Sequence, residues 1–342
     1  MPLPPLRFEP ILKRRAWGGR RLSDWSRRLP ADGVIGESWD LADLPPSIAD
    51  GVSAVAEGPL AGTPLSHLRS TASEDLLGRL PLAPTGGFPL LVKLLDAEDD
   101  LSVQVHPDPQ YAAAHPECFV KNEAWFVLEA RPGAAIYRGV RADVTPETFR
   151  TALEEGRLLE CLHRIEVEAG DCVRLPSGIC HALGAGVLVA EAQTPSDTTF
   201  RVWDWDRNDP GRPLQLEAAM ACMRFGARQE DGMPAVTRLR EIPAVEHAGA
   251  ATCRICVTPD FTIDHVRIRT APYPVITDRE PTVLVGVEGE ARVIDQEGRE
   301  ARLIPGDTVL VPAAAAAPHV SAEPAATFLR IDLPLVPPRA LA

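Results

Sequence analysis

The stretch that decides the fold is residues 170–181, with the sequence GDCVRLPSGICH. It has the pattern G-x5-P-x-G-x2-H, which sets His181 at a fixed spacing from two glycines and a proline. Glycine and proline mark turns, and residues 173–175 between them have the composition of a strand. Because the whole pattern is more specific than a lone histidine, it predicts a glycine-turn hairpin that ends on His181.

This pattern resembles the second signature motif of cupin barrels, in which the histidine points into the barrel at a metal. The rest of the chain fits an all-β design, because 34 prolines and 25 glycines punctuate many short β-like runs. We therefore predict a mainly β protein of two cupin-type (jelly-roll) β-barrels with a few short helices. Strands are expected at 88–95, 101–106, 123–130, 164–168, 173–175, 187–193, 199–205, 252–257, 261–268, 282–287, 291–294, 307–311 and 327–333, and helices at 146–156 and 214–225.

With 342 residues, the chain is long enough for two domains. A polar, irregular stretch at 226–245 is interpreted as a linker. We predict a catalytic, metal-binding cupin domain with an N-terminal extension at 1–230 and a second cupin domain at 231–342. In the second domain, residues 306–312 repeat G-x5-P, but Ala317 stands where the first motif has its histidine. The second barrel is therefore expected to bind no metal.

The candidate metal ligands come from three segments. In the segment LSVQVHPD, residues 101–108, strand alternation puts Ser102, Gln104 and His106 on one face. In KNEAW, residues 121–125, the same alternation puts Lys121 and Glu123 side by side. Two imidazoles, a carboxylate and an amide oxygen suit Zn²⁺, ahead of iron, manganese or cobalt. The expected ligands of one zinc ion per chain are Gln104, His106, Glu123 and His181; the alternative is a set of satisfied polar groups at the mouth of a barrel.

Lysine is rare in this chain, since 32 of the 35 basic residues are arginine. Lys93 lies among leucines, where a buried ammonium needs water, a carboxylate or an anionic ligand. Farther along, Asp197 and Arg201 share a face if that stretch is extended, which would aim an acid and a guanidinium into one cavity. The alternative is a surface ion pair.

Composition excludes several classes of function. A net charge of −13 disfavours nucleic acid and anionic membranes, which need a basic patch, but it leaves a small anionic substrate possible. The sequence has no apolar run of the roughly 20 residues that span a membrane, and its start lacks a secretory core. Seven irregularly spaced cysteines argue against a disulfide framework. We expect a cytoplasmic protein that is a monomer or a homodimer.

Together, these blocks resemble type I mannose-6-phosphate isomerase, or phosphomannose isomerase, in its short bacterial form. Two departures are the missing helical insertion of longer members and Val120 in place of the usual glycine before Lys121. The blocks that carry the resemblance are WGG at 17–19, GESW at 36–39, LVKLLDA, LSVQVHPD, KNEAW, LPSGICHALGAG and SDTTFRVWDWDR.

The resemblance implies a zinc enzyme that interconverts mannose 6-phosphate and fructose 6-phosphate by proton transfer through an enediol. It implies catalytic roles for Lys121, Glu191, Asp197 and Arg201, and substrate contacts at Lys93, Ser102, Trp17 and Glu37. Which of Lys121, Glu191 and Asp197 is the base is left open. Two alternatives remain: an isomerase of another aldose phosphate or a free sugar, and a cupin that binds a sugar without turning it over.

Overall fold

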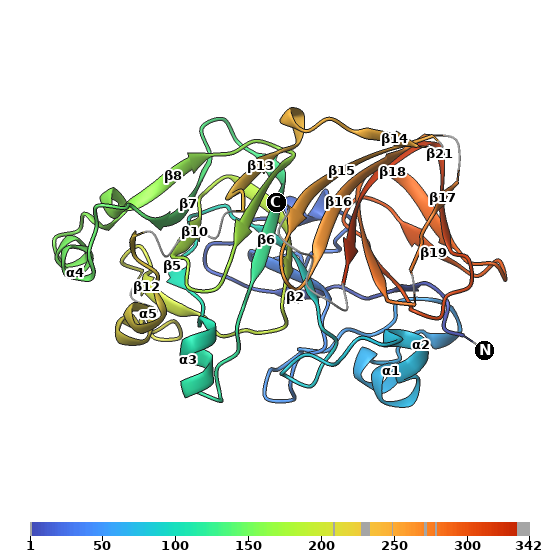
Figure 1. Ribbon diagram of the computed structural model, residues 1–342, viewed down its shortest axis with the longest axis horizontal. Helices are drawn as coiled ribbons and strands as arrows, with labels where there is room; N and C mark the ends of the chain where they lie inside the picture. The colour runs from blue at the N-terminus through green and yellow to red at the C-terminus, as the bar shows by residue number, and fades with distance from the viewer. Residues whose placement is uncertain are drawn as a thin grey trace.

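The computed structural model describes residues 2–207, 209–226, 233–247, 249–269, 272–277 and 279–333. In Figure 1 two β-rich parts stand side by side, the first mainly green and yellow and the C-terminal part orange and red. The predicted mainly β fold with a few short helices is confirmed. Among the described residues, the strand pairings give three open sheets and do not show a closed barrel.

The first part contains two sheets, one of seven strands and one of five. The seven strands follow the order β13-β9-β6-β11-β4-β3-β2, and the five follow β12-β5-β10-β7-β8. The seven are β2 (Ile11–Lys13), β3 (Glu37–Leu41), β4 (Leu91–Asp96), β6 (Glu123–Ala130), β9 (Asp171–Leu175), β11 (Val187–Gln193) and β13 (Val236–Arg238). The five are β5 (Val103–Val105), β7 (Ala135–Val140), β8 (Leu162–Glu166), β10 (His181–Leu183) and β12 (Phe200–Trp203).

The C-terminal part is a nine-stranded sheet with the order β1-β20-β18-β21-β16-β15-β14, in which β17 pairs with β21 and β19 with β18. Its first strand comes from the other end of the chain, because Leu6 lies opposite Leu310. Its strands are β1 (Leu6–Arg7), β14 (Val245–His247), β15 (Ala250–Val257), β16 (Thr262–Ile268), β17 (Tyr273–Pro274), β18 (Thr282–Ile294), β19 (Glu300–Leu303), β20 (Thr308–Val311) and β21 (His319–Asp332).

Short helices occupy the ends of the molecule. In α4 (Pro146–Glu154), Thr145 accepts a hydrogen bond from the Thr148 amide and proline takes the first helical position, as its sequence predicts. Each helix among the described residues falls short of the length and apolar character that a membrane crossing requires. The others are α1 (Leu65–Thr71), α2 (Ser73–Leu77), α3 (Pro109–Ala114), α5 (Leu216–Cys222) and the 3-10 helices η1 (Arg21–Ser23), η2 (Gly58–Leu60), η3 (Leu158–Cys161) and η5 (Leu239–Glu241).

Both faces of the seven-stranded sheet are covered. Strands β4, β9 and β11 are buried along their whole length. On one face, Leu94 and Ala190 join a hydrophobic cluster with Ile263 and Leu329 of the nine-stranded sheet. The opposite face packs toward the five-stranded sheet, where Leu183 belongs to the same cluster as Leu95 and Val189.

The expected linker is partly corrected by the structure. Residues 227–232 lie outside the described residues, but β13 is an edge strand that pairs with β9, with Val236 opposite Val173. The reason is that a polar composition does not prevent a short strand from adding to an exposed edge. The division of the chain into domains 1–230 and 231–342 stays a prediction.

Candidate active site and metal centre

One face of the seven-stranded sheet carries a row of polar and aromatic side chains. Trp39 lies opposite Lys93, Lys93 opposite Glu191, and Glu191 opposite Trp125. Residues two positions along a strand share its face. The same face therefore also carries Glu37, Gln193 and Glu123.

The five-stranded sheet presents a second row. Arg201 lies opposite Gln104, Gln104 opposite His181, and His181 opposite Arg138. Because directly opposed residues point to the same side of a sheet, these four side chains share one face. His106 follows the last residue of β5, and its backbone oxygen accepts a hydrogen bond from the Gly178 amide at 3.0 Å. The glycine turn is thereby joined to the segment that carries His106.

The two rows meet at His106, Glu123 and His181, whose side chains are each about 1% exposed. One ligand atom from each residue lies within 4.8 Å of the others. A carboxylate oxygen of Glu123 is 3.2 Å from His106 Nε2 and 3.5 Å from His181 Nε2. The sequence-predicted histidine and glutamate ligands are thus brought together by three different strands and turns.

Hydrogen bonds fix the orientation of both imidazoles. His106 Nδ1 lies 3.0 Å from the Thr198 carbonyl oxygen, and His181 Nδ1 lies 2.8 Å from the Ile179 carbonyl oxygen. A carbonyl only accepts, so each Nδ1 carries the proton. Burial lowers the pKa of His106 to about 4 and also lowers the pKa of His181, so both rings are neutral at pH 7. Both Nε2 atoms therefore direct lone pairs toward Glu123.

Glu123 adds negative charge to this buried point. Burial opposes its ionisation, but the charged surroundings, with the Lys121 ammonium 2.5 Å away, outweigh burial and lower the pKa of Glu123 well below its usual value. Its two oxygens are buried without a well-aligned hydrogen bond among the described residues. Two imidazole nitrogens and a carboxylate that converge on one point are the donor types that hold a divalent cation in proteins. The donor set therefore fits a divalent metal ion of borderline hardness.

Gln104 is the fourth predicted ligand and lies beside this triad. Its amide nitrogen is 3.3 Å from His181 Nε2, and its amide oxygen accepts a hydrogen bond from the Ser102 hydroxyl at 3.2 Å. The oxygen and nitrogen of a glutamine amide exchange places by a flip. After such a flip the oxygen would face the triad and the nitrogen would donate to Ser102, so Ser102 can support either orientation.

The lysines of the site are both ion-paired. Lys93 Nζ lies 3.0 Å from a Glu191 carboxylate oxygen and 2.5 Å from the Gln193 amide oxygen. Lys121 Nζ lies 2.5 Å from Glu123, and the attraction of that carboxylate outweighs burial and raises the pKa of Lys121. The buried ammonium of Lys93 therefore pairs with the Glu191 carboxylate.

Glu37 forms a third charged cluster on the same face. Its carboxylate accepts hydrogen bonds from Arg15 Nε at 2.7 Å and from Trp39 Nε1 at 2.6 Å. Burial opposes its ionisation, but the charges of Lys93 and Arg15 prevail and lower the pKa of Glu37 to about 2. The Trp39 ring lies beneath two ammonium groups, with Lys93 Nζ 5.4 Å and Lys13 Nζ 4.5 Å from its centroid.

The remaining predicted site residues have different environments. Arg201 is half-buried and forms no ion pair among the described residues, and its Nε is buried without a hydrogen-bond partner. Asp197 is exposed and precedes β12, so the extended stretch that would align it with Arg201 starts only at Phe200. Trp17 is buried in the hydrophobic cluster that includes Trp125. Its place in substrate binding stays a prediction.

Three residues of the cluster were not singled out from the sequence. Gln193 contacts Lys93, Trp125 Nε1 donates to Glu191 at 2.9 Å, and Trp39 holds Glu37. Each stands two positions after a residue that was singled out, namely Glu191, Glu123 and Glu37. Strand alternation, applied to the neighbouring positions, would have identified all three.

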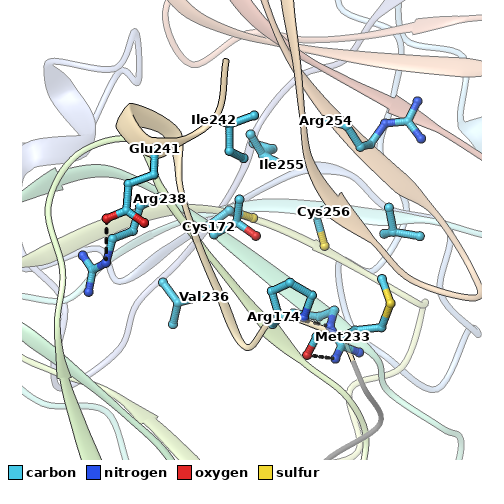
Figure 2. Close-up of a pocket in the computed structure, with 13 residues that line it drawn as sticks. Cys172, Arg174, Met233, Val236, Arg238, Glu241, Ile242, Arg254, Ile255 and Cys256 are labelled. Atoms are coloured by element: carbon cyan, nitrogen blue, oxygen red, sulfur yellow. Dashed lines mark hydrogen bonds and ion pairs between the residues drawn. The ribbon is translucent and has the colours of Figure 1, made fainter. Parts of the chain in front are cut away.

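The other face of the seven-stranded sheet borders a separate cavity of about 420 Å³. Figure 2 shows that Cys172 and Arg174 of β9, Val236 of β13 and Cys256 of β15 line it. Because Cys172 and Arg174 alternate with Val173, they point away from the cluster of His106, Glu123 and His181. This cavity therefore lies between the two parts of the molecule and not at the candidate active site.

Comparisons with known proteins identify relatives of this chain. The model of the type I phosphomannose isomerase catalytic domain matches residues 6–125. A mannose-6-phosphate isomerase of Bacillus subtilis is 40% identical over 298 residues, 86% of this chain and 88% of that protein. One from Streptococcus mutans is 35% identical over 284 residues, 80% and 84% of the two chains. The crystal structure of the mannose 6-phosphate isomerase from Bacillus subtilis superposes with a TM-score of 0.83 at 27% identity, covering 97% of this chain and 100% of that one.

Proposed function

The chain belongs to the type I phosphomannose isomerase family, and on this premise we propose that it interconverts mannose 6-phosphate and fructose 6-phosphate. The observation that carries the proposal is that two neutral imidazoles and one carboxylate, those of His106, His181 and Glu123, lie close together in a buried position. A protein that only binds a sugar has no need of a metal site. An isomerase does need one, because negative charge develops on the sugar oxygens during the reaction.

The metal we assign to this site is zinc, one ion per chain. Nitrogen and oxygen donors of borderline hardness suit Zn²⁺. Its ligands would be His106, Glu123, His181 and, after an amide flip, Gln104. The chemistry that zinc supplies when bound is Lewis-acid stabilisation of negative charge on a substrate oxygen.

The side chains around this site supply the groups that transfer the proton. An aldose–ketose change moves a proton between adjacent carbons, so it needs a base close to the substrate. Of the three candidates, Glu191 and Lys121 are buried in the cluster while Asp197 is exposed. Glu191 is oriented by hydrogen bonds from Lys93 and Trp125, which hold its carboxylate in one position.

Recognition of the phosphorylated sugar calls for positive charge that is not already neutralised. Lys93 and Lys121 are paired with Glu191 and Glu123, whereas Arg201 forms no ion pair among the described residues. We therefore assign Arg201 to an anionic group of the substrate, either the phosphate or the oxyanion that develops in the reaction. Ser102 and Glu37 lie close enough to the cluster to orient sugar hydroxyls or the residues that contact them.

The cytoplasm is the location we propose for this enzyme. All seven cysteines are free thiols, which is typical of proteins from a reducing compartment. Whether the enzyme is a monomer or a homodimer stays a prediction.

A metal analysis combined with an isomerase assay tests the function. We expect about one zinc per purified chain, loss of mannose-6-phosphate isomerase activity after chelation, and recovery when zinc is added back. His181→Ala should lose zinc and reduce activity by about 100-fold or more, because it removes a ligand. His265→Ala is the matched control, since His265 lies in β16 of the C-terminal sheet.

Three outcomes would contradict the proposal. Full activity of the metal-free enzyme would show that the reaction does not require a metal. Faster turnover of glucose 6-phosphate or free mannose than of mannose 6-phosphate would favour another isomerase on the same frame. Sugar binding without any turnover would indicate a non-catalytic binding protein.

A further inference from the structure

One contact connects the C-terminal sheet to the segment that carries Glu123. The side-chain amide of Asn122 donates from Nδ2 to a carboxylate oxygen of Asp260 at 2.7 Å. Asn122 immediately precedes Glu123 in the chain, whereas Asp260 lies in the turn between β15 and β16. A residue of the second part thus reaches the metal-ligating segment of the first.

Asn122 uses its other amide atom to hold the hairpin of His181. Its Oδ1 accepts a hydrogen bond from the Ser177 amide at 2.9 Å, and the Ser177 hydroxyl accepts one from the Lys121 amide at 2.8 Å. Ser177 is 1% exposed and stands four residues before His181. The Asn122 side chain therefore ties together the Glu123 strand, the glycine turn before His181 and the Asp260 turn.

The turn that presents Asp260 is itself rigid. The Thr258 hydroxyl accepts hydrogen bonds from the amides of Asp260 at 3.2 Å and Phe261 at 2.9 Å, and it donates to the Phe261 carbonyl at 2.8 Å. Thr258 is 5% exposed and Phe261 is fully buried. These bonds order the backbone of the turn from which the Asp260 side chain reaches Asn122.

Asp260 has no compensating cation that would explain its position. Among the described residues it forms no ion pair, and its carboxylate accepts from Asn122 alone. Burial raises the pKa of Asp260, which means that the protein bears a cost to keep a carboxylate there. An apolar residue at this position would leave the Asn122 Nδ2 donor without this acceptor.

We infer that Asp260 is a positioning residue, supplied by the C-terminal sheet, which orients Glu123 and His181 toward the metal through the side chain of Asn122. The inference rests on the zinc site proposed above. Hydrogen-bonded groups behind metal ligands fix ligand geometry, and their loss typically weakens metal binding by about 10–100-fold. The C-terminal sheet, which is expected to bind no metal, thereby supports the metal site of the first part through Asn122.

The test measures zinc affinity in the full-length protein. Metal-free wild type, Asp260→Ala and Asp260→Asn are titrated with zinc in competition with a chromophoric chelator. We expect Asp260→Ala to bind zinc about tenfold more weakly or worse. Asp260→Asn should bind close to the wild type, because its amide oxygen can still accept the hydrogen bond from Asn122.

Asp295→Ala is the matched control. Asp295 is a buried aspartate in another turn of the same sheet, where it accepts hydrogen bonds from the amides of Glu297 and Arg299, each at 2.9 Å. Its loss should lower the melting temperature without changing zinc affinity. If Asp260→Ala does not fold, Asp260→Ser replaces it, because the shorter hydroxyl keeps the turn polar but does not reach Asn122.

The outcomes separate this inference from the proposed function. If wild type and Asp295→Ala bind zinc and Asp260→Ala binds it equally well, the inference is overturned while the zinc site stands. Equal weakening in Asp260→Ala and Asp295→Ala, or in Asp260→Ala and Asp260→Asn, also overturns it. If the wild type binds no zinc, both the proposed function and the inference fail.

Discussion

At the scale of single residues, Glu37 shows how the site tolerates buried charge. Its carboxylate is 9% exposed and is held by Arg15, Trp39 and the field of Lys93. With a pKa of about 2, well below its ordinary value of 4.5, this carboxylate stabilises the folded state above pH 4.5. That contribution is lost as the pH falls from 4.5 through 2.

We predict that Glu37→Gln lowers the free energy of unfolding at pH 7 by about 3 kcal/mol, since each pKa unit corresponds to about 1.4 kcal/mol. The difference from wild type should shrink as the pH falls below 4.5. Urea denaturation at a series of pH values between 7 and 3 measures both effects.

Glu57→Gln is the control for this prediction. Glu57 also pairs with an arginine, Arg7 at 3.0 Å, but its side chain is 42% exposed. Its replacement should cost within about 1 kcal/mol, the range of exposed ion pairs. Equal costs for the two variants, or a Glu37→Gln deficit that is independent of pH, would contradict the prediction.

Strand alternation made most of the site predictable residue by residue. It placed Gln104 with Ser102 and Lys121 with Glu123 because those stretches are extended or nearly so. It failed at Asp197, where the chain is not yet in a strand, so no periodicity relates that side chain to Arg201. Strand alternation predicts which side chains share a face only where the backbone is regularly extended.

At the scale of elements, the turn before His181 depends on a glycine. Gly178 has a φ of +86°, and a Cβ there would lie 3.0 Å from the Cys222 carbonyl oxygen and 2.8 Å from Arg224 Nε. Its amide also donates to the His106 carbonyl at 3.0 Å. Any side chain at this position therefore strains the backbone and displaces the segment that carries His106, a proposed metal ligand.

We predict that Gly178→Ala destabilises the protein by more than the roughly 1–2 kcal/mol that a left-handed backbone costs a non-glycine residue, and that it also weakens zinc binding. Gly133→Ala is the control, because Gly133 has a φ of +78° and open space around its would-be Cβ. Urea denaturation and zinc titration of both variants provide the measurement. The prediction is wrong if the two variants are equally stable or if Gly178→Ala keeps wild-type zinc affinity.

Strands with a clear hydrophobic pattern in their own sequence were predictable. Strands that form only because they pair with a neighbouring strand were not. Strands β6 and β11 coincide with the expected ranges because they are long and apolar. Strand β3, with the sequence ESWDL, has polar residues on both faces, since Glu37 faces the site while Ser38 and Asp40 face the C-terminal sheet. Such a strand has no amphipathic pattern in its sequence, and it forms because it pairs with the neighbouring strands of the sheet.

At the scale of the whole molecule, the N-terminal segment joins the two parts. Strand β1 pairs with β20, and the amides of Ala313 and Ala314 donate to the carbonyls of Leu76 and Asp75 in α2, at 3.2 and 3.0 Å. In Figure 1, α1 and α2 lie below the C-terminal sheet. Strand β1 has only two residues and pairs with a strand some 300 positions away, so the local sequence carries no signal for it. Composition and periodicity could therefore not predict this arrangement.

A buried ion pair stands at this junction. Arg27 Nη2 lies 2.8 Å from an Asp40 carboxylate oxygen, and both side chains are less than 5% exposed. The same guanidinium donates to the Ser38 hydroxyl at 2.7 Å and to the Gly306 carbonyl at 2.6 Å, so it connects β3 to the nine-stranded sheet. Burial raises the pKa of Asp40, and the charge of Arg27 opposes that rise.

We predict that Arg27→Met lowers the free energy of unfolding by about 3–5 kcal/mol, because it leaves Asp40 buried without its cation. Arg27→Met combined with Asp40→Asn should recover a large part of that loss, since no charge then remains. Arg131→Met, which breaks the half-exposed pair with Glu98, should cost no more than about 1 kcal/mol. Urea denaturation of the three variants decides: if the double variant is no more stable than Arg27→Met, the cost does not arise from the stranded carboxylate, and the junction is stabilised by packing instead.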